Sequence, residues 1–183
     1  MRVIAGSRKG HQLAAPPGRE VRPTSDRVRT VLFDTLGESV VAARVLDLFA
    51  GAGTLGVEAL SRGAHSADFV ENHRAHARLI QENLRRTHLE HHGRVILEDA
   101  FVFLSQAGRH EAPYQIILAD PPYHFSEISK LFELLEAATV LAENGTFVWE
   151  ASVRSTSLRS GNVPAFVREK IVGETVLRFY RKQ

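Results

Sequence analysis

Short hydrophobic runs alternate with longer amphipathic segments from about residue 44 to residue 150 of this chain. The runs are rich in Val, Ile, Leu and Phe, which is typical of parallel strands buried on both faces. They predict strands at residues 45–49, 67–71, 94–98, 115–119 and 146–150. The segments between them predict helices at residues 54–62, 74–88, 100–108 and 126–141. Such alternation indicates successive βαβ units, so we expect an α/β domain with helices on both faces of the sheet.

The end of the chain departs from this alternation. Two further strand-like runs, residues 166–172 and 175–182, are separated only by Gly173 and Glu174. Two residues cannot join parallel strands, which need a crossover of about a dozen residues or more, but they suit a β-hairpin. We therefore expect a seven-stranded, mostly parallel, doubly wound sheet that ends in an antiparallel hairpin.

The first 40 residues precede the alternation and should form a basic N-terminal extension packed on a main domain of residues 41–183. Residues 2–6 and 11–13 suggest a small hairpin, and a Thr-Ser-Asp run supplies capping side chains for a helix over residues 25–36. The apolar side chains of that helix fall on one face, which leaves Arg27 pointing outward. A length of 183 residues accommodates this single unit and little more.

The composition is typical of a globular protein and is compatible with a reducing compartment. Hydrophobic residues make up 44% and charged residues 24%, and no stretch approaches the roughly 18 uninterrupted apolar residues of a membrane-spanning helix. The start of the chain lacks the apolar core of a secretory signal, and the lack of cysteine excludes disulfides and thiolate metal sites. We expect a cytoplasmic protein with no membrane contact.

A glycine-rich segment follows the first predicted strand and opens a helix. Residues 47–56 read D-L-F-A-G-A-G-T-L-G and contain a G-x-G-x-x-G pattern at Gly51, Gly53 and Gly56. Such glycines let the backbone turn sharply beside a ligand, and Glu71, 20 residues after Gly51, can accept hydrogen bonds from ribose hydroxyls. The pattern indicates a nucleotide-type cofactor without separating a dinucleotide from S-adenosylmethionine. The alternative is that the glycines only permit close packing of helix on strand.

Asp47, inside the first predicted strand, favours one of these cofactors. A carboxylate four residues before the glycine pattern would repel a dinucleotide pyrophosphate, whereas it suits the sulfonium and ammonium charges of S-adenosylmethionine. The alternative is a partly buried aspartate that caps local backbone.

A second segment, D-P-P-Y at residues 120–123, ends the fourth predicted strand at the edge where α/β sheets bind ligands. Two successive prolines lack backbone donors and hold a rigid turn. Asp120 and the Pro121 carbonyl could accept both N–H bonds of an amine on a flat base, while Tyr123 stacks on its ring. The alternative is a strand stopped by prolines and covered by an aromatic side chain.

The pairing of D-L-F-A-G-A-G-T-L-G with D-P-P-Y resembles the class I, Rossmann-like S-adenosylmethionine-dependent methyltransferases that act on exocyclic amines of bases. R-P-T-S-D-R-V-R at residues 22–29, together with G-V-E-A-L-S-R-G at residues 56–63, is similar to the RsmD family of bacterial small-subunit (16S) ribosomal RNA guanine-N2 methyltransferases. The resemblance implies S-adenosylmethionine as cofactor and direct methyl transfer to the N2 amine of an rRNA guanine. The target base should be unpaired or flipped out to reach the site.

The resemblance also assigns site residues. It implies a catalytic turn made by Asp120, Pro121, Pro122 and Tyr123. It implies cofactor contacts at Asp47, Phe49, Gly51, Gly53, Thr54, Glu71, Asn72, Asp99 and Ala100. For Asp99 an alternative stays open, because this side chain could instead cap the helix that starts near Ala100.

Basic residues are concentrated at the amino terminus. Residues 1–30 hold seven Lys or Arg side chains against Glu20 and Asp26, whereas the whole chain has a net charge of only +2. Because nucleic-acid affinity comes largely from neutralised phosphates, this excess suggests contact with a polyanion. The resemblance implies that this partner is ribosomal RNA or an assembling small ribosomal subunit, and we expect the protein to act as a monomer. The expected phosphate contacts are Arg8, Lys9, Arg22, Arg27 and Arg29. The alternative is a solvated, charged terminus.

Other functions use parts of this pattern. A nicotinamide-dependent oxidoreductase could share the glycine segment, but it would need a proton donor that D-P-P-Y does not supply at a familiar spacing. A non-catalytic RNA-binding module could keep the fold, although the intact glycines and acidic turn argue against decay. Within methyl transfer, the alternative substrate is another nucleic-acid amine, that of adenine or of a different RNA.

Two groups of residues are expected to be structural. His88, His91 and His92 lie close together in sequence, but their surroundings suggest a solvated helix end and loop, and no metal is expected. Phe147 and Trp149 lie in the fifth predicted strand and should belong to the core.

Overall fold

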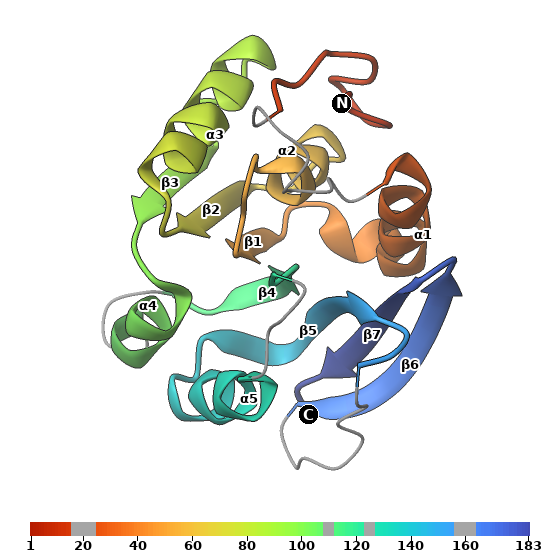
Figure 1. The fold of residues 1–183 in the computed structure, drawn as a ribbon, viewed down its shortest axis with the longest axis vertical. Helices are drawn as coiled ribbons and strands as arrows, with labels where there is room; N and C mark the ends of the chain where they lie inside the picture. The colour runs from red at the N-terminus through yellow and green to blue at the C-terminus, as the bar shows by residue number, and fades with distance from the viewer. Residues whose placement is uncertain (16–24, 108–111, 123–126, 156–163) are drawn as a thin grey trace.

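A computed structural model describes residues 1–15, 25–107, 112–122, 127–155 and 164–183. Its centre is a seven-stranded sheet with the order β3-β2-β1-β4-β5-β7-β6 (Figure 1). The strands are β1 (Arg44–Leu48), β2 (Ser66–Glu71), β3 (Gly93–Leu97), β4 (Tyr114–Ala119), β5 (Leu141–Ser152), β6 (Ala165–Val172) and β7 (Thr175–Arg181). The helices are α1 (Asp26–Leu36), the 3-10 helix η1 (Gly37–Val40), α2 (Thr54–Ser61), α3 (Arg74–Arg86), α4 (Ala100–Ala107) and α5 (Ile128–Ala137).

The sheet has the predicted mixed topology. The strands from β3 to β5 pair in parallel, and β7 pairs antiparallel with both β5 and β6. The strand order runs outward from β1 in one direction and from β4 in the other. The carboxyl ends of β2, β1 and β4 therefore stand side by side, at the point of an open α/β sheet where ligands bind.

Two hydrophobic cores cover the two faces of the sheet. Along β1 the side chains alternate between them, because successive side chains on a strand point to opposite faces. Val45 belongs to the core shared with α1, α2 and α3, whereas Leu46 belongs to the core shared with α4 and α5. The predicted core positions Phe147 and Trp149 are 0% and 3% exposed in the second core, which confirms that assignment.

β5 is longer than predicted, and α5 is shorter. The strand begins at Leu141, which pairs with Tyr114, and the register then shifts so that Thr146 pairs with Ile116. The Glu-Asn-Gly run at residues 143–145 is thus a bulge inside a strand rather than a stop after a helix. Asn144 takes a positive φ of 60° there, and its N–H donates to the Lys182 carbonyl. A bulge uses the same turn residues as a helix end, so composition alone did not separate them.

The amino-terminal segment is held by backbone bonds more than by strands. The expected hairpin contains one bridge, between Arg2 and Gln12, although neighbouring backbone groups also bond across the turn. The predicted helix cap is confirmed, because Ser25 Oγ accepts the Val28 N–H at 3.2 Å. Arg27 on this helix is exposed, as expected.

Candidate active site at the carboxyl edge of the sheet

Three loops meet where β2, β1 and β4 end. Leu48, the last residue of β1, pairs in register with Val70 of β2 and with Ala119 of β4. The glycine loop therefore starts beside both Glu71 and Asp120, which come next on the neighbouring strands. The two motifs identified in the sequence lie on adjacent strands at one edge of the sheet.

The glycine loop is built from left-handed backbone conformations. Gly51 and Gly53 have φ values of 55° and 74°, and Phe49, which carries a side chain, is held at 60°. At Gly56 an added Cβ would lie 2.3 Å from Cε1 of Phe69, so this glycine lets α2 pack closely on β2. The packing alternative is therefore correct for Gly56, whereas the positive φ of the first two glycines shapes the loop itself. Thr54, the first residue of α2, is buried behind that loop.

Asp47 is buried beneath the glycine loop, with 1% of its surface exposed. Its Oδ2 accepts the Gly56 N–H at 2.9 Å. The alternative, an aspartate that caps local backbone, is therefore confirmed for this oxygen. Burial raises the pKa of the Asp47 carboxyl well above its ordinary value, the Gly56 hydrogen bond opposes that rise, and the charges of Asp120 and Glu71 add to it. Two further carboxyls at these strand ends thus act on Asp47, and this clustering of acidic groups favours a cationic ligand over an anionic one.

Glu71 ties the end of β2 to the glycine loop. Its Oε2 accepts the Gly51 N–H at 2.8 Å, and its Oε1 accepts the His73 N–H at 2.8 Å. His76 Nδ1 lies 3.6 Å from the same Oε1. A carboxylate oxygen can accept more than one hydrogen bond, so this arrangement leaves capacity for ribose hydroxyls. Asn72, between these groups, is exposed.

Asp99 caps α4. Its Oδ1 accepts the N–H of Phe101 at 2.9 Å and the N–H of Val102 at 3.2 Å, so the capping alternative is confirmed. A cofactor contact for Asp99 stays a prediction. Ala100, which follows it, is 4% exposed.

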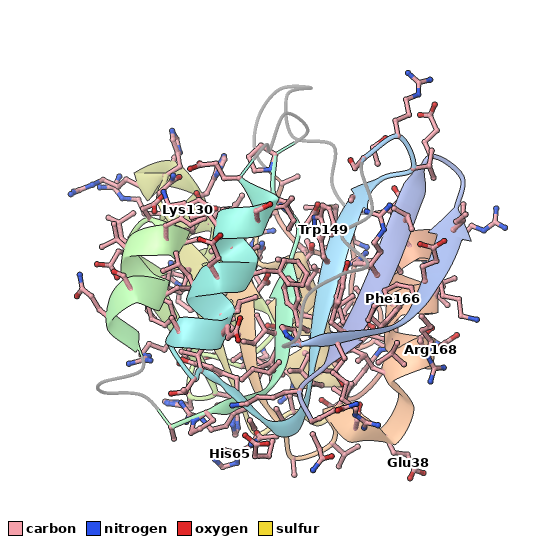
Figure 2. All side chains as sticks on the ribbon, turned by 90° about the horizontal axis from the view of Figure 1, so that it is seen from below. Glu38, His65, Lys130, Trp149, Phe166 and Arg168 are labelled. Atoms are coloured by element: carbon pink, nitrogen blue, oxygen red, sulfur yellow. The ribbon has the colours of Figure 1, made fainter. Side chains whose placement is uncertain are left out.

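An aromatic pair that we did not predict joins the start of α4 to the glycine loop. The rings of Phe49 and Phe101 meet edge to face, with centroids 6.4 Å apart. The Lys130 ammonium lies 4.6 Å from the centroid of the Phe101 ring, and Figure 2 labels Lys130 on the α4 and α5 side of the sheet. The place of Phe101 directly after Asp99 and Ala100 was the available signal for this contact.

The acidic turn directly follows β4. Asp120 and Pro121 are half-buried and Pro122 is exposed. Asp120 lies close enough to Asp47 to raise the pKa of that carboxyl. Tyr123, the fourth expected member of the turn, lies outside the described residues.

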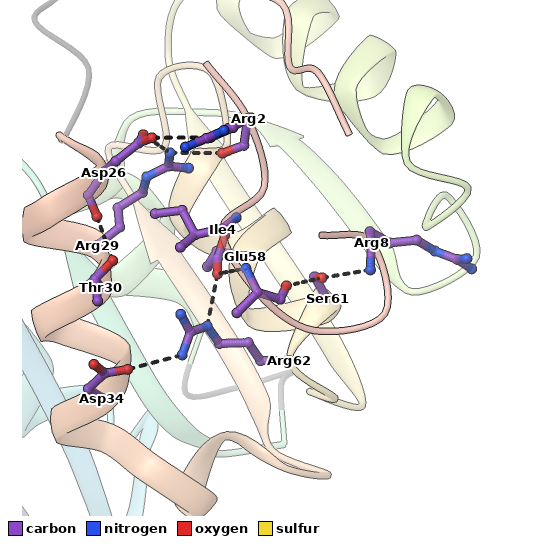
Figure 3. Close-up of polar contacts among 11 residues, drawn as sticks. Arg2, Ile4, Arg8, Asp26, Arg29, Thr30, Asp34, Glu58, Ser61 and Arg62 are labelled. Atoms are coloured by element: carbon purple, nitrogen blue, oxygen red, sulfur yellow. Dashed lines mark hydrogen bonds and ion pairs between the residues drawn. The ribbon is translucent and has the colours of Figure 1, made fainter. Parts of the chain in front are cut away.

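Arg29 does not face solvent, and its assignment as a phosphate contact is wrong. Its side chain is completely buried, and Nη2 donates to the Arg2 carbonyl at 2.9 Å and to Asp26 Oδ1 at 2.7 Å (Figure 3). The hydrogen bond from Arg29 is the main cause that lowers the pKa of Asp26. The guanidinium thus joins α1 to the amino-terminal segment and is not available to RNA.

Arg8 and Lys9 lie at the end of α2 away from the glycine loop. The Arg8 N–H donates to Oγ of Ser61, the last residue of α2, at 3.0 Å (Figure 3). An eight-residue helix is about 12 Å long, which separates this end from the glycine loop. Lys9 is exposed. Arg22, the remaining expected phosphate contact, lies outside the described residues.

The segment before residue 16 nevertheless returns to the site. Glu58, which is completely buried, accepts the N–H groups of Ile4 and Ala5 at 2.8 and 3.0 Å. Farther along, Asn83 Oδ1 accepts the Ala14 N–H at 2.8 Å while its Nδ2 donates to the Ala52 carbonyl at 2.9 Å. Asn83 therefore connects the amino-terminal segment directly to the glycine loop.

Neither a metal centre nor a membrane span is found in the described part of the chain. No group of three or more His, Cys, Asp or Glu side chains is placed there to hold a metal ion. No helix among the described residues is long and apolar enough to cross a membrane.

Known proteins are similar to this chain in sequence and in fold. A protein-family model described as "Conserved hypothetical protein 95" matches residues 1–181. The "Ribosomal RNA small subunit methyltransferase D" of Escherichia coli K12 is 36% identical over 186 aligned residues, which cover 100% of this chain and 90% of that protein.

Solved structures extend the comparison. A hypothetical protein of Thermus thermophilus is 30% identical, covers 98% of both chains and has a TM-score of 0.84. The T. thermophilus 16S rRNA N2 G1207 methyltransferase RsmC, solved with AdoMet and guanosine, has a TM-score of 0.71 at 24% identity over 91% of this chain and 45% of its own. The second likeness concerns the fold alone, and it agrees with the Rossmann-like methyltransferase architecture expected from the sequence.

Proposed function

This chain belongs to the RsmD family, described as "Conserved hypothetical protein 95", and we propose that it transfers a methyl group from S-adenosylmethionine to the N2 amine of a guanine in small-subunit ribosomal RNA. One observation carries the proposal. The glycine loop and the Asp-Pro-Pro turn begin at paired residues, Leu48 and Ala119, on adjacent parallel strands. A cofactor on the loop and a base at the turn would therefore be neighbours.

The residues at the strand ends fit S-adenosylmethionine. Glu71, held by two backbone N–H groups, would accept the ribose hydroxyls, and the segment from Asp99 to Phe101 would border the adenine. A bound sulfonium and ammonium would favour the charged forms of the Asp47 and Asp120 carboxyls, and these carboxylates would in turn stabilise the two cations. When bound, this cofactor supplies an electrophilic methyl group.

The protein contributes alignment and hydrogen bonding at the acceptor. A guanine amine is conjugated with its ring and is a poor nucleophile, so its lone pair must be localised and aimed. Asp120 and the Pro121 carbonyl would accept its two N–H bonds and favour that electron distribution in the transition state. Asp120 need not remove a proton before the methyl group moves.

The charge of the site disfavours a nicotinamide dinucleotide. A pyrophosphate at the glycine loop would face Glu71 and lie above Asp47, and like charges at such short range destabilise binding. Calorimetry with S-adenosylhomocysteine and with NAD tests this point. We expect binding of the first compound and no binding of the second.

The proposed function is tested with ribosomal RNA and small subunits from a strain that lacks this protein. Incubation with the protein and tritiated S-adenosylmethionine should place label in the small-subunit RNA, and digestion should recover it as N2-methylguanosine. RNA from the parental strain is the matched control, because its target is already methylated. Label in an adenosine would assign a different amine, and no label in either substrate would contradict the proposal.

A further inference from the structure

We propose that Arg178 holds the O6 and N7 edge of the target guanine while the N2 amine of the same base lies at the Asp120 turn. The inference rests on the proposed function and adds to it a residue that selects guanine over adenine. Its starting point is a row of side chains that continues sideways from the end of β4.

The row crosses four strands at one level. Ala119 of β4 pairs with Trp149 of β5, Trp149 pairs with Arg178 of β7, and Arg178 pairs with Glu169 of β6. Figure 2 labels Trp149 on β5, on the side of the sheet that α5 covers. Because Asp120 directly follows Ala119, the row begins at the catalytic turn.

The guanidinium of Arg178 is fixed in this row. It lies over the Trp149 ring, 5.0 Å from the ring centroid, so the side chain extends from β7 over β5. Its Nη2 donates to the Ser155 carbonyl at 3.1 Å, and Nε lies 3.6 Å from Glu169 Oε2. Stacking and pairing together restrict the guanidinium to one orientation.

Unsatisfied donors gather at this place. Arg178 is 4% exposed and Trp149 is 3% exposed. Arg178 Nε and Nη1 and Trp149 Nε1 are three of the six buried side-chain polar atoms that lack a hydrogen-bond partner in the described part of the chain. Buried donors without acceptors are costly and uncommon. Arg29 has two such atoms as well, but it lies between α1 and the amino-terminal segment, whereas the donors of Arg178 and Trp149 lie in the row that begins at the end of β4. From their number and their place in this row we infer a ligand that brings acceptors.

The spacing suits a purine. Adjacent strands lie about 4.8 Å apart, so the backbones of Ala119 and Arg178 are roughly 10 Å apart, and the arginine side chain crosses part of that gap over Trp149. β4 stops at Ala119, whereas β5 and β7 continue to pair from Glu150 to Ser152. A base with its amine at the turn could extend over this step toward Arg178.

The chemistry selects guanine. Guanine presents two acceptors, O6 and N7, on the side opposite its N2 amine, and the arginine fork is the usual protein partner of that pair. Adenine presents an amine in place of O6, which would face the Arg178 donors with another donor. The same contact thus orients guanine and rejects adenine.

A purely structural role is the competing explanation. Arg178 could serve only to join Trp149, Glu169 and Ser155 and so close the edge of the sheet. Loss of stability in a variant would not distinguish the two roles. The test must therefore detect the N7 atom of the substrate itself.

The experiment compares two small-subunit rRNA transcripts, one ordinary and one made with 7-deazaguanosine, which keeps the pairing edge but lacks the N7 acceptor. Both are offered free and reconstituted into small subunits. Methyl transfer is measured for the unaltered protein, for Arg178→Lys, which keeps the charge and loses the fork, and for Arg181→Lys. Arg181 is the matched control because it is exposed on the same strand.

The unaltered protein and Arg181→Lys should act about tenfold more slowly on the 7-deaza RNA, because one hydrogen bond of a charged fork is lost. Arg178→Lys should be slow on both RNAs, with no further loss on the 7-deaza RNA. Any folding defect of the 7-deaza RNA would slow all three proteins alike. If the 7-deaza RNA lowers the rate of Arg178→Lys by the same factor as that of the unaltered protein, the inference is therefore overturned. An unaltered protein that methylates both RNAs equally also overturns it. A protein that methylates neither RNA contradicts the proposed function first.

Discussion

The Glu71 carboxylate accepts the Gly51 N–H at 2.8 Å and so connects the end of β2 to the glycine loop after β1. The same side chain accepts the His73 N–H through its other oxygen. Glu71 therefore shapes the loop as well as offering acceptors to a ligand. This double role means that its substitution should change cofactor affinity more than the chemical step.

We predict that Glu71→Gln weakens S-adenosylhomocysteine binding by about 10- to 100-fold, the range for hydrogen bonds to a charged group. In the variant, the amide nitrogen also faces a backbone N–H, of Gly51 or of His73, that bonds to a carboxylate oxygen in the unaltered protein. Isothermal calorimetry measures the effect, and a higher cofactor concentration should restore most of the methyl-transfer rate.

Glu82→Gln provides the control for that measurement. Glu82 lies half-buried on α3, where it pairs with Arg86, and its loss should leave cofactor affinity unchanged. Parental affinity in Glu71→Gln would show that Glu71 does not hold the cofactor.

A second prediction concerns Asp47 and pH. Because burial raises the pKa of this carboxyl in the folded state, the folded protein holds the proton more tightly than the unfolded chain. This contribution to stability is complete below the ordinary value of 3.8 and is lost as the pH rises through the raised pKa. Asp47→Asn removes the titration and keeps an oxygen for the Gly56 N–H. Relative to the variant, the unaltered protein should lose stability as the pH rises from about 4 toward neutrality.

Urea unfolding of both proteins at several pH values, without ligand, measures that difference. Titrating groups away from these strand ends affect both proteins alike, so the difference between the two curves reports Asp47 together with its interactions with Asp120 and Glu71. A difference in unfolding free energy that stays constant with pH, or that favours the unaltered protein at high pH, would contradict the account of Asp47.

A third prediction separates two neighbouring arginines on α1. Arg29→Met should lower the free energy of unfolding by about 1–3 kcal/mol, because the Arg2 carbonyl and Asp26 lose a charged partner. It should leave RNA affinity unchanged. Exposed Arg27 is the contrast: Arg27→Ala should reduce RNA affinity and flatten its salt dependence by a slope of about 0.7 to 0.9 if it contacts one phosphate.

Binding of RNA at several salt concentrations, together with thermal unfolding, checks both variants. An Arg27→Ala protein with the parental salt slope would make this residue part of a solvated surface. A weaker salt dependence in Arg29→Met would show that the buried guanidinium influences RNA binding after all.

The different positions of Arg27 and Arg29 show which features of α1 the sequence pattern could predict. The apolar residues of α1 predicted its buried face, and Arg27 lies outside that face, as expected. Arg29 adjoins the same face, but its burial depends on the Arg2 carbonyl, 27 residues earlier in the chain. A contact between distant segments leaves no pattern in the local sequence. The prediction from basic residues alone therefore counted Arg29 among the RNA contacts, although its role is structural.

The strands and the two motifs were easier to predict. A parallel strand buried on both faces is mostly apolar, so β1, β2 and β4 were visible in the sequence, and the motifs at their ends followed from topology. The prediction of β5 was incomplete because its bulge contains Asn144 and Gly145, residue types that also end helices. The row that joins Trp149, Arg178 and Glu169 depends on the register in which β5, β7 and β6 pair, and this register could not be predicted from the sequence.

The most direct test of the central claim is methyl transfer by Asp120→Asn, measured beside its S-adenosylhomocysteine affinity. The substrate is small-subunit RNA or particles from a strain that lacks this protein, with tritiated S-adenosylmethionine as donor. The unaltered protein should place label in N2-methylguanosine. Asp120→Asn should lower that rate by about 100-fold or more, because an acceptor aimed at the reacting amine is lost, while cofactor affinity stays within a few fold. Equal losses of affinity and rate, or an undiminished rate, would contradict the role of Asp120 at the acceptor base.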